Sequence, residues 1–162
     1  MGLFNNLFKK ESGISLAAPM AGRCVSIKEV PDPTFADEIL GKGVAVIPTE
    51  GKVYAPANGV ITTVFSTGHA LAMTTDEGAE ILIHVGLETV SLEGKPFTIH
   101  TQTDAKVQKG DLLIEADLKA IEEAGLKIIT PMVICNTDEF SEVNGITDKE
   151  VVPGDEVLKL QK

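Results

Sequence analysis

Gly and Pro interrupt this sequence every few residues, and that spacing limits what the chain can fold into. Turn-forming motifs recur from GKG (41–43) to VNG (143–145), and short runs rich in Val, Ile and Thr lie between them. Short strands at a spacing of about 8–12 residues are typical of all-β sandwiches and barrels. We therefore predict an all-β, antiparallel sandwich of the barrel-sandwich type. The runs VAVIP, VITTVF, HALAMT and EILIHVG are its expected hairpin-linked strands.

Three regions depart from the strand pattern. Residues 117–125 have apolar side chains at helical spacing before a glycine, and residues 31–41 resemble a loop with a helical turn. We expect one or two short helical turns there. We also predict a flexible N-terminal segment at 1–12, ahead of a single domain at 13–162. The apolar stripe of the N-terminal segment fits an amphipathic helix lying on an anionic membrane, or a frayed terminus that packs on the body.

The acidic composition of the chain excludes several classes of function. The formal net charge is −10 and aromatic residues are scarce, whereas surfaces that bind nucleic acid are basic and often stack aromatic rings on bases. No apolar run approaches the roughly 18 residues of a transmembrane helix, and a signal-peptide pattern is missing from the N-terminus. We therefore expect a cytoplasmic protein with reduced, buried Cys24 and Cys135, no nucleic-acid partner and at most peripheral membrane contact.

A histidine in the middle of an apolar strand indicates a site. His84 lies in the run AEILIHVGLETV (79–90), and His69 opens the preceding run HALAMT. An even-length loop in the turn TDEG (75–78) would pair His69 directly with His84 on one face of the hairpin. The two Cβ atoms would then be ~4.5–5.5 Å apart. A three-residue loop would shift the pairing by one residue and place the rings on opposite faces.

Strand alternation also sorts the neighbours of His84. Leu82 and Gly86 share its face, and Gly86 leaves room for another group to approach closely. The opposite face, which we expect to point into the core, carries Ile81, Ile83, Val85 and Leu87.

Three kinds of chemistry fit a pair of facing histidines. The pair can be structural, it can supply half of a metal site that needs three or four ligands, or one imidazole can be a nucleophile that accepts a phosphoryl group. No third ligand is evident, because His100 has no motif around it. Thr67, two residues before His69, can orient that ring and fix its tautomer. Since no Walker or kinase motif occurs, a phosphohistidine here needs another protein as donor.

Several segments of the chain resemble one family over nearly its whole length. They are APMAG (18–22), VPDPTFADEILGKGVAVIPTEG (30–51), APANGVITTVFSTGHALAM (55–73), GAEILIHVGLETVSLEG (78–94), VQKGDLLIEADL (107–118) and TPMVICN (130–136). In these residues the chain is similar to the glucose-type enzyme IIA of the bacterial phosphoenolpyruvate-dependent sugar phosphotransferase system. The order and spacing of the GHA and IHVG histidines are the most specific part of the resemblance.

The resemblance implies a phosphocarrier role. Such domains are compact antiparallel β-sandwiches that accept a phosphoryl group from the carrier protein HPr. They pass it to a cysteine of the enzyme IIB domain, which phosphorylates the sugar as it enters through the membrane IIC domain. By the same resemblance, His84 is the phosphorylated nucleophile, His69 relays and stabilises the group, and Thr67 orients His69. Backbone N–H groups near Gly86 are expected to steady the phosphoryl oxygens.

The resemblance also implies a docking surface around the histidine pair. Two acidic residues, Asp32 and Glu88, match positions that flank the site and can pair with arginines of a partner. Relatives usually have Asp where this chain has Glu88. The apolar positions that match the docking surface of the family are Phe35, Ile39, Phe65, Leu82 and Val90.

Competing functions are weighed on the same residues. A zinc metallopeptidase of related fold needs a His-x-His element, which is missing, and biotinyl or lipoyl carriers need a Lys at a hairpin tip where this chain has TDEG. A regulatory binding protein is the open alternative. In that role the unphosphorylated form inhibits transporters or metabolic enzymes, in some cases with a zinc ion that bridges His69 and His84 to the partner. We expect no intrinsic metal and no cofactor. The sugar, glucose or a related one, depends on the IIB and IIC partners.

Overall fold

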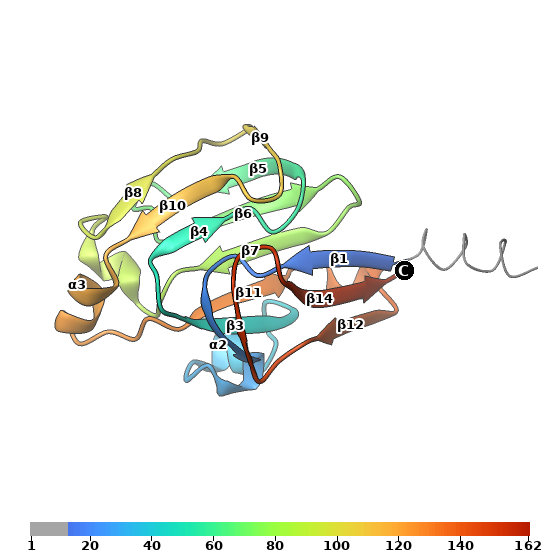
Figure 1. The fold of residues 1–162 in the computed structure, drawn as a ribbon, viewed down its shortest axis with the longest axis horizontal. Coiled ribbons are helices and arrows are strands. Elements are labelled where there is room, and N and C mark those ends of the chain that lie inside the picture. The colour runs from blue at the N-terminus through green and yellow to red at the C-terminus, as the bar shows by residue number, and fades with distance from the viewer. Residues whose placement is uncertain (1–12) are drawn as a thin grey trace, which may run out of the picture.

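The computed structural model describes residues 13–162, and all of its sheets are antiparallel (Figure 1). The largest sheet has eight strands in the order β13 (Lys149–Val151), β2 (Gly22–Ser26), β3 (Lys42–Pro48), β11 (Thr130–Ile134), β7 (Glu80–His84), β6 (Ala70–Thr75), β5 (Gly59–Val64) and β9 (Lys106–Val107). Two three-stranded sheets accompany it. They are β1 (Gly13–Ala17), β14 (Glu156–Gln161) and β12 (Glu142–Gly145), and β4 (Lys52–Tyr54), β10 (Leu112–Ala116) and β8 (Phe97–Ile99).

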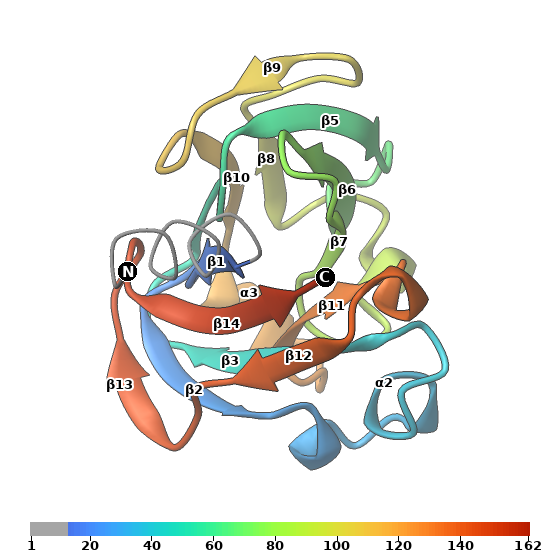
Figure 2. The same cartoon turned by 90° about the vertical axis from the view of Figure 1, so that its right-hand side faces the viewer.

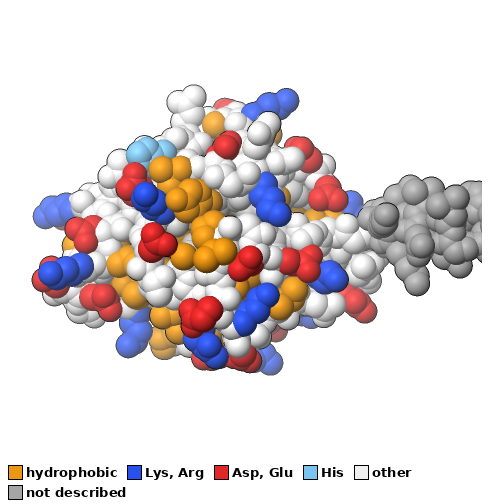
Figure 3. All heavy atoms as spheres, in the orientation of Figure 1, with side chains coloured by type: hydrophobic (Ala, Val, Ile, Leu, Met, Phe, Trp, Pro, Cys, Tyr) orange, Lys and Arg blue, Asp and Glu red, His pale blue; other side chains and the backbone are white. Residues whose placement is uncertain are grey.

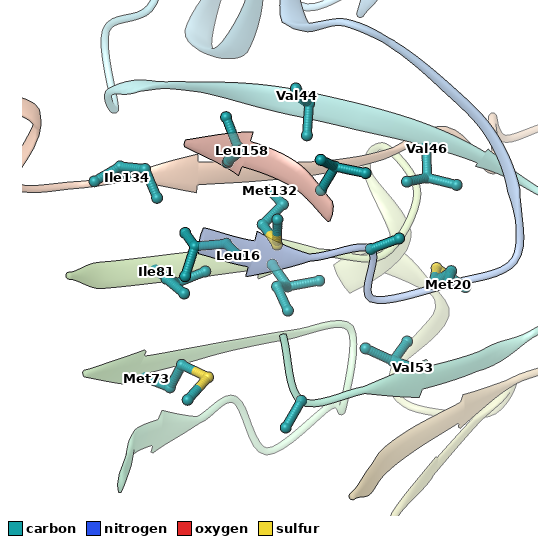
Figure 4. Close-up of a cluster of buried hydrophobic side chains, with 14 of the residues drawn as sticks. Leu16, Met20, Val44, Val46, Val53, Met73, Ile81, Met132, Ile134 and Leu158 are labelled. Carbon is teal, nitrogen blue, oxygen red and sulfur yellow. The ribbon is translucent and has the colours of Figure 1, made fainter. Parts of the chain in front are cut away.

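The main core fills the space between the large sheet and the two small ones. Its side chains come from strands of all three sheets, among them Leu16, Val53, Met73, Ile81, Met132 and Leu158, which lie together in Figure 4. Burying such side chains contributes roughly 1.5–3 kcal/mol each relative to leaving them exposed. The predicted antiparallel β-sandwich is therefore confirmed.

A second apolar cluster lies on the outer face of the large sheet. Strand β3 is buried on both faces, because Val44 and Val46 belong to the main core and Ala45 to the second cluster. The chain that covers this outer face includes η1 (Ile27–Glu29) and α2 (Pro33–Ala36), which lie beside the lower strands in Figure 2. Members of the second cluster are Val25, Ile27, Val30, Phe35, Ala45, Leu87, Ile129 and Val133, with Leu82 packed against them.

Short helices form where the sequence predicts helical turns. Helix α2 lies within 31–41, and α3 (Leu118–Glu123) lies within 117–125. Each begins at an aspartate whose side chain accepts a hydrogen bond from the first turn, Asp32 from Thr34 N–H and Asp117 from Ala120 N–H. Two further 3-10 turns are η2 (Thr89–Leu92) and η3 (Thr137–Glu139).

The predicted hairpins are confirmed only in part. Strands β5, β6 and β7 follow one another as neighbours in the large sheet. Strand β3, which contains VAVIP, pairs instead with β2 and β11. Residues 1–12, for which we predict a flexible segment that fits either an amphipathic helix or a frayed terminus, lie outside the described residues.

The surface carries both charged and apolar side chains, and the two cysteines are not bonded to each other. In Figure 3, hydrophobic side chains reach the surface between interspersed acidic and basic side chains. Cys24 and Cys135 are both free thiols. Cys24 is buried, which raises its pKa to about 11, whereas Cys135 is exposed and the expectation that it is buried is wrong. Within residues 13–162, none of the helices has the length and apolar content that a membrane crossing requires.

Candidate functional site

His84 is the last residue of β7 and lies on the outer face of the large sheet. Ile81 and Ile83 of the same strand are fully buried in the main core, whereas Leu82 packs against the second cluster, as the alternation predicts. The ring of Phe35 packs against the His84 ring, with centroids 5.4 Å apart. Helix α2 therefore supports the imidazole from a segment of the chain about fifty residues earlier.

A backbone carbonyl fixes the tautomer of His84. The Nδ1 atom lies 2.7 Å from the carbonyl oxygen of Gly86. Because a carbonyl oxygen only accepts, Nδ1 carries the proton, and the lone pair of the neutral ring is on Nε2. The carbonyl reaches the ring because Gly86 has φ +72, a left-handed conformation that turns the chain out of the strand.

His69 lies in the turn just before β6. Its Nδ1 atom is 2.5 Å from Thr67 Oγ1, and Gly68 between the two has φ +74. The ring contacts the ring of Phe65 at a centroid distance of 5.3 Å and that of His84 at 5.0 Å, nearly edge to face. The two imidazoles thus meet, and each has its Nδ1 atom engaged by a neighbour in its own chain segment.

The register that we predicted for the hairpin is wrong, although the two rings meet. His84 pairs with Ala70, and β6 begins only at that residue. The loop has three residues, with Thr75 N–H donating to Ala79 O and Gly78 at φ +96. Such loops are built on a left-handed glycine at the third position. The rings still approach because His69 precedes β6 and follows the Gly68 turn, where strand alternation no longer decides the direction of a side chain.

Burial keeps both rings neutral. It lowers the pKa of His69, and the neighbouring His84 charge acts in the same direction. Burial also lowers the pKa of His84, while the hydrogen bond to Gly86 and the charge of Asp32 oppose that shift. At pH 7 the Nε2 atom of His84 therefore carries a free lone pair.

The expected role of Gly86 needs correction. Its N–H donates to Thr130 Oγ1 at 3.4 Å, and the N–H groups on either side donate to His69 O (from Val85) and Lys127 O (from Leu87). These amides are engaged within the protein and are not free to hold a phosphoryl oxygen. A Cβ at Gly86 would lie 2.8 Å from Lys127 O, so the space beside it is already filled. Gly86 contributes its carbonyl oxygen and its conformation.

The predicted apolar docking residues divide into exposed and buried ones. Ile39 is 69% exposed, Val90 52% and Phe65 43%. Leu82 is half-buried, and Phe35 is only 4% exposed because it packs behind His84. Phe35, which the resemblance matches to the docking surface, is therefore not itself exposed, since α2 folds onto the outer face of the sheet. Leu87, predicted for the main core, belongs to the second cluster instead.

The predicted acidic residues lie on two separate turns. Asp32 caps α2, accepting from Thr34 N–H at 2.9 Å, and is close enough to His84 to oppose the lowering of its pKa. Glu88 is exposed at φ +59, just before η2. His100 is exposed and lies 2.8 Å from Glu115 Oε1, as expected for a histidine outside the site. Within residues 13–162, no three His, Cys, Asp or Glu side chains are grouped to hold a metal ion.

Two buried threonines near the histidines were not predicted. Thr89 Oγ1 donates to Val85 O at 2.6 Å, and Thr130 Oγ1 accepts from Gly86 N–H. Both side chains are fully buried. Thr89 has a weak signal in the sequence, since it is a polar residue shortly after Gly86, whereas Thr130 comes from a strand about forty residues later.

Comparisons with known proteins agree with this fold and identify the family of the chain. The family model described as the phosphoenolpyruvate-dependent sugar phosphotransferase system, EIIA 1, matches residues 14–140. The chain is 43% identical over 157 residues to the glucose-specific EIIA component of Oceanobacillus iheyensis, covering 94% of this chain and 95% of that protein. It is 40% identical to the glucose-specific EIIA component of Haemophilus influenzae over 100% of both chains.

Two further comparisons concern a longer relative and a solved structure. The chain is 44% identical over 148 residues to the β-glucoside-specific EIIBCA component of Halalkalibacterium halodurans, and the match covers 91% of this chain but 23% of that protein. The solved structure of glucose permease IIA from Mycoplasma capricolum matches with a TM-score of 0.85 and 34% identity, over 91% of this chain and 95% of that chain.

Proposed function

The chain belongs to the EIIA 1 family of the phosphoenolpyruvate-dependent sugar phosphotransferase system, and from this membership we propose that His84 carries a phosphoryl group from HPr to enzyme IIB. The observation that carries the proposal is the hydrogen bond from His84 Nδ1–H to Gly86 O. It leaves Nε2 with its lone pair in a ring whose pKa burial has lowered. An unprotonated imidazole nitrogen is the form that attacks phosphorus.

Each transfer exchanges one bond to phosphorus for another. In the first, His84 Nε2 forms a bond to the phosphorus of phosphohistidine on HPr, and the donor nitrogen leaves with the electron pair of the broken bond. In the second, a cysteine thiolate of enzyme IIB attacks the same phosphorus, and the pair returns to Nε2. The Nδ1 atom of His84 keeps its proton throughout and goes on donating it to Gly86 O. Catalysis then consists of positioning and charge stabilisation, as phosphoryl transfer requires.

His69 is the second participant in this proposal. Its ring centroid is 5.0 Å from that of His84, and Thr67 Oγ1 engages its Nδ1 atom. When the threonine hydroxyl donates to Nδ1, the proton of the neutral ring is on Nε2, which can then donate to a phosphoryl oxygen. Because the amides of Val85, Gly86 and Leu87 are engaged within the protein, we propose this imidazole as a donor to the phosphoryl group.

The charges around the site explain why a partner protein is needed. A phosphoryl group adds about two negative charges beside Asp32 and Glu88, on a chain of net charge −10. We propose that basic residues of HPr and enzyme IIB supply the compensating charge, and that exposed Ile39, Phe65 and Val90 form the apolar contact around it. Fusion of an EIIA domain to EIIB and EIIC in the β-glucoside-specific relatives supports a IIB permease as acceptor. A cytoplasmic location goes with this role.

A regulatory binding role is the second candidate, favoured by the same exposed apolar residues. The two histidines can also contribute to a zinc site shared with a partner: His84 has a lone pair on Nε2, and His69 has one there when its Nδ1–H donates to Thr67 Oγ1 instead of accepting from it. Two nitrogen ligands are too few for a structural zinc, so a partner carboxylate would have to complete the set. We propose no metal or cofactor bound by this chain alone.

Labelling with phosphoenolpyruvate, the first enzyme of the system and HPr tests the proposal. The wild-type protein is expected to become phosphorylated, and His84→Ala to remain unlabelled. His69→Ala is expected to become labelled but to fail in delivery to glucose-type IIB. His100→Ala is the matched control, since this histidine is exposed and pairs with Glu115. Full labelling of His84→Ala, or normal delivery by His69→Ala, would contradict the assignment of the corresponding residue. Delivery to IIBC membranes of different specificity identifies the sugar.

A further inference from the structure

Buried polar side chains concentrate at the histidine end of the β6–β7 hairpin. In the described part of the chain, the buried polar side chains are His69, Thr75, Thr89 and Thr130. Thr75 closes the turn at the far end, where its hydroxyl accepts from Ala79 N–H at 2.9 Å. The other three lie at the opposite end. Because a buried hydroxyl without a partner is costly, the bonds that Thr89 and Thr130 make show what they hold.

These two threonines hold both ends of one peptide unit. The peptide that joins Val85 to Gly86 accepts at its carbonyl from Thr89 Oγ1 at 2.6 Å, and it donates from its N–H to Thr130 Oγ1 at 3.4 Å. The Thr130 hydroxyl has a single proton, which it donates to Ile128 O at 2.9 Å, so it can only accept from Gly86.

The next peptide unit is the one that meets the His84 ring. Its N–H, from Leu87, donates to Lys127 O at 3.0 Å, and its carbonyl, from Gly86, accepts from His84 Nδ1–H at 2.7 Å. The direction of this carbonyl depends on the φ and ψ angles of Gly86. Glycine restricts these angles less than any other residue, so they must be held by the surroundings. The segment from Lys127 to Thr130 and the hydroxyl of Thr89 supply that restraint.

We propose that Thr130 and Thr89 are positioning residues for phosphoryl transfer, acting through the Gly86 peptide that holds His84 in its Nδ1–H tautomer. The effect on rate rests on the function proposed above, whereas the effect on the tautomer is a property of the free protein. When the restraint is lost, the Gly86 carbonyl turns away and the Nε2–H tautomer becomes populated. A ring protonated at Nε2 has no lone pair at the atom that attacks.

The test compares threonine variants by two readouts. Thr130→Val keeps the shape of the side chain and removes the hydroxyl, and Thr130→Ser restores the hydroxyl. Thr75→Val is the matched control, because it removes another buried hydroxyl that bonds to a backbone N–H, at the other end of the hairpin. The ¹⁵N chemical shifts of His84 report the tautomer in the unphosphorylated protein. The rate of phosphorylation by phospho-HPr reports the consequence for transfer.

We expect Thr130→Val to show a mixture of His84 tautomers and phosphorylation slowed about tenfold, the effect of losing the buried hydrogen bond that restrains Gly86 N–H. Thr130→Ser is expected to restore both readouts, and Thr75→Val to keep both while losing comparable stability. A folded Thr130→Val that keeps the Nδ1–H tautomer overturns the proposal, whatever its stability. If Thr130→Val does not fold, Thr89→Val replaces it, because Thr89 bonds to the same peptide. A mixture of His84 tautomers in Thr89→Val then supports the proposal, and an unchanged Nδ1–H tautomer overturns it.

The two proposals fail in different ways. If the wild-type protein accepts no phosphoryl group from phospho-HPr, the proposed function is wrong, and the ¹⁵N comparison of wild type with Thr130→Val still decides the positioning role. If phosphorylation proceeds and the tautomer is insensitive to Thr130 and Thr89, the proposed function stands and the positioning role is overturned.

Discussion

Each end of the β6–β7 hairpin has a left-handed glycine and a buried threonine that accepts a backbone hydrogen bond. The two ends differ because only one of them also holds a side chain, the imidazole of His84. At the turn, Gly78 adopts φ +96 and buried Thr75 accepts from Ala79 N–H. At the other end, Gly86 adopts φ +72 and donates to buried Thr130. At the turn, the hydrogen bonds of Thr75 and Ala79 involve no side chain other than the threonine hydroxyl. At the other end they continue through the Gly86 carbonyl to an imidazole. The same local structure that closes a loop can therefore also select the tautomer of a ring.

The space around the two glycines differs more than their conformations do. A Cβ at Gly78 would meet only Lys162 Nζ at 3.7 Å, whereas a Cβ at Gly86 would lie 2.8 Å from both Lys127 O and Thr89 Cγ2. The turn glycine is needed for its dihedral angles alone. The glycine at the histidine end is needed for its dihedral angles and for its small size.

The largest effect is expected from replacing these glycines by alanine. Gly78→Ala should cost about 1 kcal/mol, the strain of a left-handed alanine. Gly86→Ala adds a clash with backbone and should cost roughly 2–5 kcal/mol in free energy of unfolding, with His84 displaced from its carbonyl. Denaturant unfolding of both variants measures the difference. Equal losses at the two positions would show that the contacts beside Gly86 do not constrain it.

How far the sequence predicts this site follows from the same comparison. Alternation along β7 predicts which of its residues face the main core, because burial of apolar side chains enforces a period of two within a strand. It does not predict the loop length in TDEG, since that depends on whether Gly78 takes a left-handed conformation. The two rings are in contact although the predicted register is wrong, because His69 lies outside the regular strand.

Contacts between distant segments account for the remaining errors. Phe35 is apolar in a loop-like segment, and nothing near it in the sequence tells that α2 folds onto His84. Thr130 and the Lys127 carbonyl reach Gly86 from about forty residues away. The resemblance to a family names the histidines, but the atoms that fix their tautomers are known only once these segments are brought together.

A smaller effect on stability is expected from pH, through the two histidines at one end of the hairpin. Burial lowers the pKa of both His69 and His84 in the folded protein, whereas the unfolded chain keeps a histidine pKa of about 6.5. Below that pH the unfolded state binds more protons, so the free energy of unfolding falls as the pH drops through about 6.5 and toward the folded-state values. Above it, these two groups add no pH dependence.

Denaturant unfolding at pH 8 and pH 5.5 measures this contribution. Wild type and Thr75→Val are expected to lose the same amount of stability between the two pH values, because Thr75 lies at the turn end. The double variant His69→Gln, His84→Gln is expected to lose less. If the double variant loses as much as wild type, the two rings are not held neutral by the fold.

The smallest effect on the protein itself is expected from an exposed residue beside the histidine end. Ile39 is 69% exposed and follows α2, which supports His84, and Val152 is 58% exposed in the turn between β13 and β14. Replacing either by serine should change the free energy of unfolding by no more than about 0.5 kcal/mol, as is usual for surface positions. Under the proposed docking, Ile39→Ser should nevertheless raise the KM for phospho-HPr about three- to tenfold, the loss of one apolar interface contact. Val152→Ser should leave the KM unchanged. Equal KM values for the two variants would show that Ile39 is not part of the docking surface. The tautomer of His84 should be the same in both variants, because it is held by Gly86 and not by these exposed side chains.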